Sequence, residues 1–452
     1  MELSLAEAAG ILGSTSGAPE RLAQSYSIDS RTLAAGALFF AIRGPNFDGH
    51  KFVAQALERG AVSAVVECDW AASAPPAVLP FLIPVANTIS ALQDLGSAVR
   101  RKWGRPLVAV TGSTGKTTTK ELIAAVLGGR YAVHKSGGNL NNHLGVPLTL
   151  LALTKAHDLA VLEFGMSHAG EIAHLARVAA PALGVVTNVA PVHLESFDSL
   201  DGIAAAKHEL IENLTSPSTA ILNYDDTRVR DFRDGFIGRV VTYGFEHGAD
   251  YRASGFRLSK GAHGSLESLF RVQGPECEAE LRLALPGRHN VENALAAIAV
   301  GRLLGASPGA VAAALASFTP FRSRTEVVQL SAGATLINDS YNSNPRALEQ
   351  MLKLLRDWPA AERRIVVAGE MLELGPSSPE WHRAAGHTCA TSSVDWLLAV
   401  QGNARLLVEG ALESGFPSER ARFFAGAEEA GRFCRSILRP RDVVLVKGSR
   451  GV

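Results

Sequence analysis

Near-continuous apolar runs, separated by helical segments, dominate the middle of the chain. The runs VAVTG, DLAVLEFG and LGVVTNV are typical of parallel strands that are buried on both faces. Predicted helices, including residues 116–127 and 200–214, separate these runs. This order predicts an α/β fold with a doubly wound parallel sheet, in which a ligand binds at the carboxyl ends of the strands.

The two flanks of this region carry other patterns. Short mixed segments over residues 1–85 predict a small α/β domain. Alternating segments at about 240–285 (RVVTYGF, YRASGFRL, SLFRVQ and AELRLAL) predict an antiparallel β flank, before a helix that begins at Asn290. Strands and helices alternate again towards the carboxyl end, without a GxGxxG fingerprint. We therefore expect three domains, at residues 1–85, 86–318 and 319–452.

Composition narrows the class of protein. Hydrophobic residues make up 47% of the 452 residues, and 44 basic residues balance 44 acidic ones. No net field attracts nucleic acid or an anionic membrane, so the expected partners are small molecules and any anion site is local. The four cysteines have no metal or redox spacing, and no apolar run approaches the ~18 residues of a membrane span. We expect a cytoplasmic monomer without integral membrane association.

The most informative segment is TGSTGKTTT, which lies between a predicted strand and a predicted helix. Backbone N–H groups of such a loop point at phosphate oxygens, Lys116 adds a positive charge, and the Thr117 hydroxyl can bind Mg²⁺. The first glycine stands two residues before the Gly-Lys pair, where the usual phosphate loop has four. The alternative is a plain turn between strand and helix. The order of elements favours a nucleoside triphosphate site made by Gly112, Ser113, Thr114, Gly115, Lys116, Thr117 and Thr118.

Polar residues at other strand ends add to this prediction. Glu163 ends DLAVLEFG, where a carboxylate can hold Mg²⁺ against phosphates, although a strand-end glutamate facing water is the alternative. His193 follows another strand end and is either a structural histidine or part of a metal site. Lys207 lies on a small-residue helical face. Its ammonium would favour phosphate but repel Mg²⁺, and the residues alone leave its role open.

Three further polar strings are candidates for ligand contacts. INDSYNSNP holds Asp339, Asn342 and Asn344 before a predicted helix, and N-capping needs only one of them. The surplus favours ligand binding. SIDSR and NFDGH are polar loops beside apolar strands, and each is a weak signal alone; they contain Ser30, Arg31, Asn46, Asp48 and His50.

Taken together, the motifs resemble one family along nearly the whole chain. TGSTGKTTT, GNLNNHLGVPLTLL, LEFGMS, TNVAPVHLESF, AAKHELIENL, LPGRHNVENALAAIA, RTEVV, INDSYNSNP and VVAGEMLELG occur in order, and the likeness runs from about residue 27 to 450. The series is similar to the Mur ligases, the ATP-dependent amide-bond ligases of peptidoglycan precursor synthesis. The resemblance implies an N-terminal domain for a UDP-sugar, a central P-loop ATPase and a C-terminal Rossmann-like domain that closes during turnover.

Within the family, INDSYNSNP, GEMLELG and VKGSR resemble most the member that joins D-alanyl-D-alanine to UDP-N-acetylmuramoyl-tripeptide. The DNPR-type motif, typical of the ligase that adds the third amino acid, is absent from the sequence. This implies that ATP activates the tripeptide carboxylate as an acyl phosphate, which the dipeptide amine then attacks. The third residue of the tripeptide, a diaminopimelate or a lysine, is left open.

The resemblance also implies roles for single residues. Lys116 and Thr117 would hold the ATP phosphates and Mg²⁺, while Glu163 and His193 match metal ligands. Lys207 matches a carbamylated lysine, a change that turns the ammonium into a carboxylate able to sit beside Mg²⁺. The remaining matches are Asn290 and Asn293 for adenine, Arg324 for phosphates, Asp339 for ribose, Asn139 and Asn142 for the UDP-sugar in the central domain, and Ser30, Arg31 and the NFDGH loop for the N-terminal substrate site.

Two departures and two alternatives remain. Tyr341 stands where some members have a lysine, so no basic role is expected there. The sequence ends at VKGSRGV, where relatives usually continue into another helix, which suggests a truncated chain or a missing last element. A folylpolyglutamate-type ligase shares the expected architecture, but SIDSR and INDSYNSNP argue against it. A non-catalytic nucleotide switch would not need Glu163, His193, Lys207 and Asp339 together.

Overall fold

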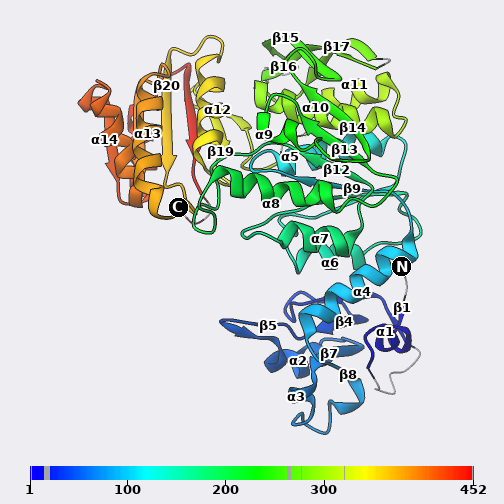
Figure 1. Ribbon diagram of the computed structural model, residues 1–452. Helices are drawn as coiled ribbons and strands as arrows, with labels where there is room; N and C mark the ends of the chain where they lie inside the picture. The colour runs from blue at the N-terminus through cyan, green and yellow to red at the C-terminus, as the bar shows by residue number, and fades with distance from the viewer. Residues whose placement is uncertain are drawn as a thin grey trace.

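Three main sheets, each with its own helices, organise the computed structural model (Figure 1). The structure describes residues 1, 3–14, 21–261, 266–275, 277–319, 321–449 and 451. The N-terminal domain lies below the central domain in this view, and the C-terminal domain lies beside the central one. Within the described residues, none of the helices has the length and apolar character needed to cross a membrane.

The N-terminal domain is built on a four-stranded parallel sheet in the order β3-β4-β7-β8. A small hairpin, β5–β6, projects from it beneath the C-terminal domain (Figure 1). The elements are β1 (Leu3–Ser4), α1 (Leu5–Ile11), β2 (Leu22–Ala23), β3 (Ser25–Ser27), β4 (Ala37–Phe40), β5 (Arg43–Gly44), β6 (Phe47–Asp48), α2 (Val53–Glu58), β7 (Ser63–Glu67), α3 (Cys68–Ala71) and β8 (Leu82–Val85).

The central domain carries a nine-stranded sheet in the order β10-β11-β9-β12-β13-β14-β15-β16-β17. Every residue of the three predicted buried strands, β9, β11 and β12, is buried. The strands are β9 (Leu107–Thr111), β10 (Val133–Lys135), β11 (Leu159–Glu163), β12 (Leu183–Val186), β13 (Thr219–Asn223), β14 (Arg239–Gly244), β15 (Tyr251–Lys260), β16 (Leu266–Gly274) and β17 (Cys277–Leu283).

The predicted antiparallel flank begins later than the alternation suggested. The segment RVVTYGF forms β14, which is parallel to both β13 and β15, and only β15, β16 and β17 pair in antiparallel fashion. Alternation favours an antiparallel strand with one exposed face, but the last four residues of β14 are all buried, as is typical of a parallel strand. The direction of β14 follows from the crossover through α9 (Thr227–Asp231), which returns the chain to the starting edge of the sheet.

Helices cover both faces of the central sheet. Helix α10 begins at Arg288, two residues before the predicted start at Asn290. Helix α4 is bounded by clear local signals, because the Asn87 side chain accepts a 2.9 Å hydrogen bond from the Ser90 N–H and Gly104 ends the helix at φ 68°. Together with α9, the helices of this domain are α4 (Thr88–Trp103), α5 (Lys116–Gly128), α6 (Gly145–Leu151), α7 (Glu171–Ala179), α8 (Leu200–Glu212), α10 (Arg288–Leu303) and α11 (Pro308–Ala316).

The C-terminal domain contains a six-stranded sheet in the order β18-β19-β23-β20-β21-β22, parallel except for β18. Its strands and helices follow the predicted alternation. They are β18 (Glu326–Gln329), β19 (Thr335–Asp339), α12 (Pro345–Arg356), β20 (Arg363–Gly369), α13 (Ser378–Ala390), β21 (Trp396–Val400), α14 (Arg405–Glu413), β22 (Ala421–Phe424), α15 (Ala427–Ile437) and β23 (Asp442–Lys447).

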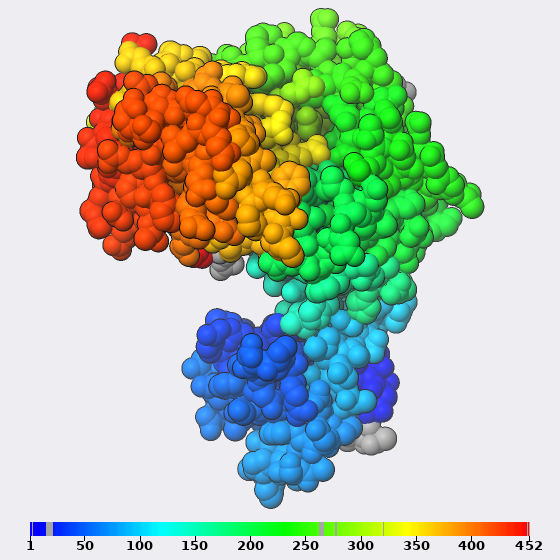
Figure 2. Space-filling view, turned by 60° about the vertical axis from the view of Figure 1, so that its left-hand side comes forward, coloured from blue at the N-terminus to red at the C-terminus, as the bar shows by residue number. Residues whose placement is uncertain are grey.

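The hydrophobic cores join the domains unequally. One cluster of buried side chains runs from Phe40 and Val65 of the N-terminal sheet, through Leu95 of α4, to Leu162 of the central sheet. The C-terminal domain has clusters of its own and meets the central domain through fewer apolar contacts, Leu266 among them. Figure 2 shows the N-terminal domain set apart from the C-terminal domain by an open cleft.

Candidate active site

A cavity of about 930 Å³ lies where the carboxyl edge of the central sheet faces the C-terminal domain. Its wall is formed by the loop before α5, the ends of β11 and β19, the start of α10 and the segment after β20. The predicted site residues that line it are Ser113, Thr114, Gly115, Lys116, Thr117, Thr118, Asn139, Asn142, Glu163, His193, Asn290, Asn293, Arg324, Asp339, Asn342 and Asn344.

The loop between β9 and α5 is held in place by protein contacts alone. The Thr114 N–H donates a 3.0 Å hydrogen bond to Oδ1 of Asn188, and the Asn188 side-chain amide donates to the Thr114 carbonyl at 3.1 Å. Gly112 has φ 142°, and a Cβ there would lie 1.9 Å from Oγ1 of Thr187. Gly115 has φ 80° and caps α5. The loop therefore presents a pre-formed helix N-terminus, as an anion site requires.

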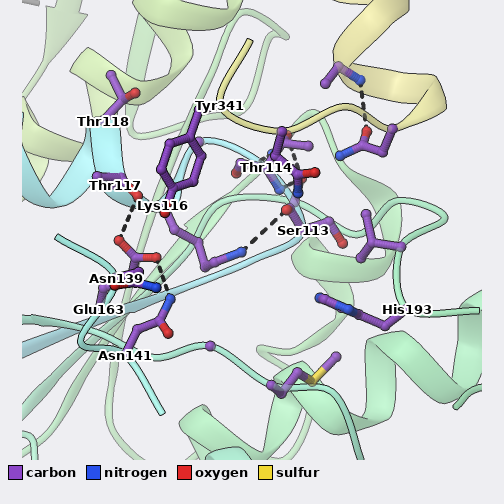
Figure 3. Close-up of a pocket in the computed structure, with 18 of the residues that line it drawn as sticks. Ser113, Thr114, Lys116, Thr117, Thr118, Asn139, Asn141, Glu163, His193 and Tyr341 are labelled. Atoms are coloured by element: carbon purple, nitrogen blue, oxygen red, sulfur yellow. Dashed lines mark hydrogen bonds between the residues drawn. The ribbon is translucent and has the colours of Figure 1, made fainter. Parts of the chain in front are cut away.

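Lys116 folds back over this loop. Its ammonium donates to the Gly112 carbonyl at 2.8 Å. It also donates to the Ser113 carbonyl at 3.3 Å (Figure 3). Burial lowers the pKa of Lys116, and the Glu163 carboxylate offsets part of that shift. The lysine is thus stored against carbonyl oxygens at the mouth of the loop, where phosphate oxygens would be stronger partners.

Glu163 is fixed from both sides. The Thr117 hydroxyl donates a 2.7 Å hydrogen bond to Oε2, and the Asn141 amide donates a 2.9 Å hydrogen bond to Oε1 (Figure 3). A hydroxyl and a carboxylate at this spacing are hard oxygen donors of the kind that Mg²⁺ takes, together with phosphates. In the described part of the chain no three His, Cys, Asp or Glu side chains form a ready metal cluster, so the protein offers only part of a coordination shell.

His193 and Glu373 meet across the boundary between the central and C-terminal domains. His193 Nδ1 lies 2.6 Å from Glu373 Oε2, and both residues have positive φ, 56° and 63° respectively. Left-handed backbone is uncommon for residues other than glycine and marks constrained positions. In Figure 3 His193 lies away from the Glu163 group, on the far side of Lys116.

Lys207 and Gly112 lie behind the cavity wall and do not line it. Lys207 projects from α8 and is 1% exposed, and among the described residues no hydrogen bond or ion pair reaches its ammonium. Burial, with the charge of Lys116, lowers the pKa of Lys207 well below its usual range. The lysine therefore carries a buried amine that is easily left uncharged.

The opposite end of the cavity is formed by α10 and β19. Asn293 Oδ1 accepts a 3.2 Å hydrogen bond from the Thr119 hydroxyl, and the Asn290 amide donates to the Pro286 carbonyl at 2.9 Å. Asp339 pairs with Lys447 at 2.7 Å, which lowers the pKa of this buried carboxyl despite desolvation.

Arg324 and two asparagines complete this end. The Arg324 guanidinium lies 4.0 Å from the ring centroid of Tyr341, the residue that stands where some relatives carry lysine. Asn344 accepts a 2.9 Å hydrogen bond from the Ala347 N–H and so caps α12. Asn342 accepts from the Ser343 N–H at 2.9 Å.

The predicted residues of the N-terminal domain do not line this cavity. The Ser30 hydroxyl donates to Gln55 at 3.0 Å, and Arg31 pairs with Asp29 at 2.8 Å. Asp48 Oδ1 lies 2.7 Å from Nδ1 of His50, and Asn46 is exposed. Of these five residues of the N-terminal domain, Arg31 and Asn46 are exposed, whereas Ser30 and His50 are buried.

The cavity residues that the sequence did not single out include Asn141, Glu373 and Lys447, each of which contacts a predicted site residue. Asn141 lies inside GNLNNHLG, together with the predicted residues Asn139 and Asn142, and nothing in the string distinguishes the asparagine that contacts Glu163. Glu373 and Lys447 lie inside GEMLELG and VKGSR, which carried the family resemblance without assigned roles. Each contacts a residue more than 100 positions away in the chain, at His193 and Asp339.

Known protein families match this chain along most of its length. Three family descriptions match successive parts of the chain: the Mur ligase family catalytic domain at residues 23–100, the Mur ligase middle domain at 110–301 and the Mur ligase glutamate ligase domain at 323–450. A UDP-N-acetylmuramoyl-tripeptide–D-alanyl-D-alanine ligase of Bacillus subtilis is 35% identical over 426 residues, covering 94% of this chain and 90% of that relative. The chain belongs to the Mur ligase family.

Solved structures of Mur ligases named MurF also superpose on this chain. A MurF crystal structure from Acinetobacter baumannii superposes with a TM-score of 0.89 at 29% identity, covering 100% of this chain and 96% of that one. MurF from Thermotoga maritima in complex with ADP superposes with a TM-score of 0.83 at 26% identity, covering 95% and 94%. The predicted family and the predicted three-domain α/β fold are confirmed.

Proposed function

We propose that this Mur ligase joins D-alanyl-D-alanine to UDP-N-acetylmuramoyl-tripeptide in peptidoglycan precursor synthesis, at the expense of ATP. The observation that carries the proposal is the single cavity in which a phosphate loop and Glu163 of the central domain face Asp339 of the C-terminal domain. The Bacillus subtilis relative, which is named for this reaction, is similar over almost the whole chain.

The reaction converts a carboxylate into an amide in two steps. The terminal carboxylate of the tripeptide attacks the γ-phosphorus of ATP, the bond to the ADP oxygen breaks, and an acyl phosphate forms. The dipeptide amine then attacks the acyl carbon, loses a proton, and expels phosphate. The loop N–H groups and Lys116 would stabilise charge on the transferred phosphoryl group.

ATP would span the cavity from the phosphate loop to β19. Lys116 would exchange its two carbonyl contacts for phosphate oxygens, and Thr117 would offer its hydroxyl to the metal. Asn290 and Asn293 would face the adenine. Arg324 would reach the phosphates, and Asp339, held by Lys447, would accept from the ribose hydroxyls.

The donor set at Thr117 and Glu163 suits Mg²⁺, which neutralises charge on the phosphates when bound. Glu163 would supply the carboxylate, and His193 would join it from the facing loop. Lys207 would join as a carbamate. Its buried amine, without a charged partner, supports this modification, because an uncharged amine adds to CO₂ with loss of one proton.

The UDP-linked substrate would enter from the open cleft seen in Figure 2. We assign Asn139 and Asn142 to the UDP-sugar, and the asparagines of the C-terminal loop, Asn342 and Asn344, to further substrate contacts. Ser30, Arg31, Asn46, Asp48 and His50 of the N-terminal domain would hold the nucleotide sugar. Because the cleft separates this domain from the C-terminal domain, closure of the C-terminal domain would complete the site.

We further propose domain limits at residues 1–85, 86–318 and 319–452, since each range contains one main sheet. One chain supplies all of the candidate residues, which supports a monomeric enzyme. Use of ATP supports a cytoplasmic location.

The test measures phosphate release from ATP with UDP-N-acetylmuramoyl-tripeptide, with and without D-alanyl-D-alanine, followed by product mass. Tripeptides with lysine and with diaminopimelate are compared. Release that needs the dipeptide, with a pentapeptide product, is the expected result. Turnover only with a folate acceptor would indicate the folylpolyglutamate-type ligase, and nucleotide binding without acceptor-dependent turnover would indicate a switch.

A further inference from the structure

Glu373 lies in a short segment, residues 370–375, that the proposed chemistry does not yet use. The segment is braced within the C-terminal domain: the Met371 N–H donates a 2.9 Å hydrogen bond to Nε2 of His382, and the Leu372 N–H donates at 3.3 Å to the Ser449 hydroxyl. Glu373 itself has φ 63°. A left-handed glutamate costs of order 1 kcal/mol and persists only where its surroundings enforce it.

These hydrogen bonds hold the segment so that the Glu373 carboxylate lies in the cavity. Glu373 lines it, and its side chain remains 56% exposed although Oε2 lies 2.6 Å from His193. Gly375 packs so closely on the facing loop that a Cβ there would lie 2.9 Å from the Leu194 carbonyl oxygen. The negative charge of Glu373 also acts on Lys116, which places it within electrostatic range of the phosphate loop.

The other acidic side chains of the cavity are already engaged. Glu163 accepts from Thr117 and Asn141, and Asp339 pairs with Lys447. The remaining two are Glu171, which accepts from the Ser167 and His168 N–H groups, and Glu292, which is partly buried and lies 3.9 Å from Arg288. Among the described residues that line the cavity, Glu373 is the carboxylate with an exposed face and only a histidine as partner.

We propose that Glu373 is the site that binds the ammonium of the acceptor dipeptide, an inference that rests on the proposed function. The ATP side of the cavity selects for anions, whereas the acceptor must bring a cationic amine towards the acyl carbon beside Lys116. A carboxylate near the phosphate loop, but carried by the other domain, provides a charge-assisted hydrogen bond for that amine. The ammonium takes the place of the His193 ring on Oε2.

Two other roles for Glu373 give different kinetics. As a latch between domains, it would affect every turnover equally, whatever the acceptor. As a site for the side-chain ammonium of the third tripeptide residue, it would change the KM of the UDP-linked substrate. The proposal instead predicts an effect confined to the dipeptide.

The experiment compares the wild type with Glu373→Gln, which keeps the shape and removes the charge, and with Glu373→Asp, which keeps the charge on a shorter arm. Glu195→Gln is the matched control, because Glu195 is an exposed carboxylate on the facing loop outside the cavity. For each variant the KM values of both substrates are measured. Hydroxylamine then replaces the dipeptide and traps the acyl phosphate as a hydroxamate, since it is mostly uncharged at neutral pH.

The expected result is a KM for D-alanyl-D-alanine raised by about 10- to 100-fold in Glu373→Gln. Glu373→Asp recovers part of it, and Glu195→Gln matches the wild type. The KM of the UDP-tripeptide and the rate of hydroxamate formation stay unchanged. The proposal is overturned by an unchanged dipeptide KM, by equal losses with both nucleophiles, or by a raised tripeptide KM. A wild type that makes hydroxamate but no dipeptide product would refute the proposed acceptor, and this inference with it.

Discussion

The side-chain amide of Asn141 donates a 2.9 Å hydrogen bond to Oε1 of Glu163, while Oε2 accepts from Thr117. Asn141 therefore fixes the rotation of the carboxylate that we assign to Mg²⁺. Asn141→Ala is expected to lower kcat by about 10- to 100-fold, the usual effect of losing a group that orients a metal ligand. The measurement is the ligation rate as a function of Mg²⁺ concentration, with half-saturation expected at higher Mg²⁺.

Asn213→Ala is the control, because Asn213 donates to the Glu209 carbonyl at 2.8 Å at the end of α8 and does not line the cavity. It should leave the Mg²⁺ dependence unchanged. A normal Mg²⁺ dependence in Asn141→Ala would remove the orienting role.

The phosphate loop predicts a contrast between two glycines of the same helix region. A Cβ at Gly115 would lie 2.4 Å from Oδ1 of Asn293, on a residue with φ 80°. Gly115→Ala should weaken ATP binding at least about tenfold and cost about 1–3 kcal/mol of folding free energy, because the backbone is strained and Asn293 must move. Gly128→Ala, at the other end of α5, meets nothing within 4 Å and should be neutral. Equilibrium binding of ATP and unfolding midpoints check both.

The activity of the enzyme should depend on CO₂ through carbamate formation at Lys207. Burial holds its pKa well below the usual range, so that above the lowered pKa the amine is uncharged and can form a carbamate. The wild type, dialysed free of CO₂, is expected to lose activity and regain it with hydrogencarbonate. Lys207→Met should be at least about 100-fold slower, the scale of losing one electrostatic stabiliser.

Lys207→Glu separates the carboxylate from the modification. It should keep measurable activity that does not depend on hydrogencarbonate, because the acidic group is then built in. Wild-type activity that is not lost on removal of CO₂, or that hydrogencarbonate does not restore, would contradict the carbamate.

Glu292 should make stability depend on pH. Burial raises the pKa of Glu292 to about 7 from a usual value of 4.5. Between these values the native state binds a proton that the unfolded state releases, so stability is lost as pH rises from 4.5 through 7. Glu292→Gln removes this dependence. Its unfolding free energy, relative to wild type, should improve by about 2 kcal/mol between pH 5 and pH 8 in urea titrations. A pH-independent difference would show that Glu292 is ionised throughout.

The strands and the phosphate loop were predictable because their signals are local. Apolar runs identify β9, β11 and β12, and a ligand edge follows once three such strands are parallel. The direction of β14 was not predictable, since it depends on a crossover and not on the pattern of the strand itself.

The contacts of the site were less accessible to sequence than its loops. Glu373 meets His193 only because two domains face each other, and residues 180 positions apart leave no periodicity to read. Lys207 could be placed on a helix, but its burial behind the cavity wall depends on how α8 packs. Asn142 and Asn344 are predicted to contact ligands; the Asn344 side chain also caps α12, and the Asn142 side chain accepts from the Gly145 N–H at the start of α6. One polar residue therefore serves both fold and cavity.

The unequal sharing of the cores has a mechanical consequence. The N-terminal and central sheets share one apolar cluster through α4, so moving one sheet against the other would expose buried apolar side chains to water. The C-terminal domain keeps its own clusters and is joined to the rest by a single passage of chain between α11 and β18, where Ser323 and Thr325 have φ 62° and 50°. The N-terminal and central domains therefore form one rigid body, and the C-terminal domain can rotate against it about a hinge that contains Ser323 and Thr325.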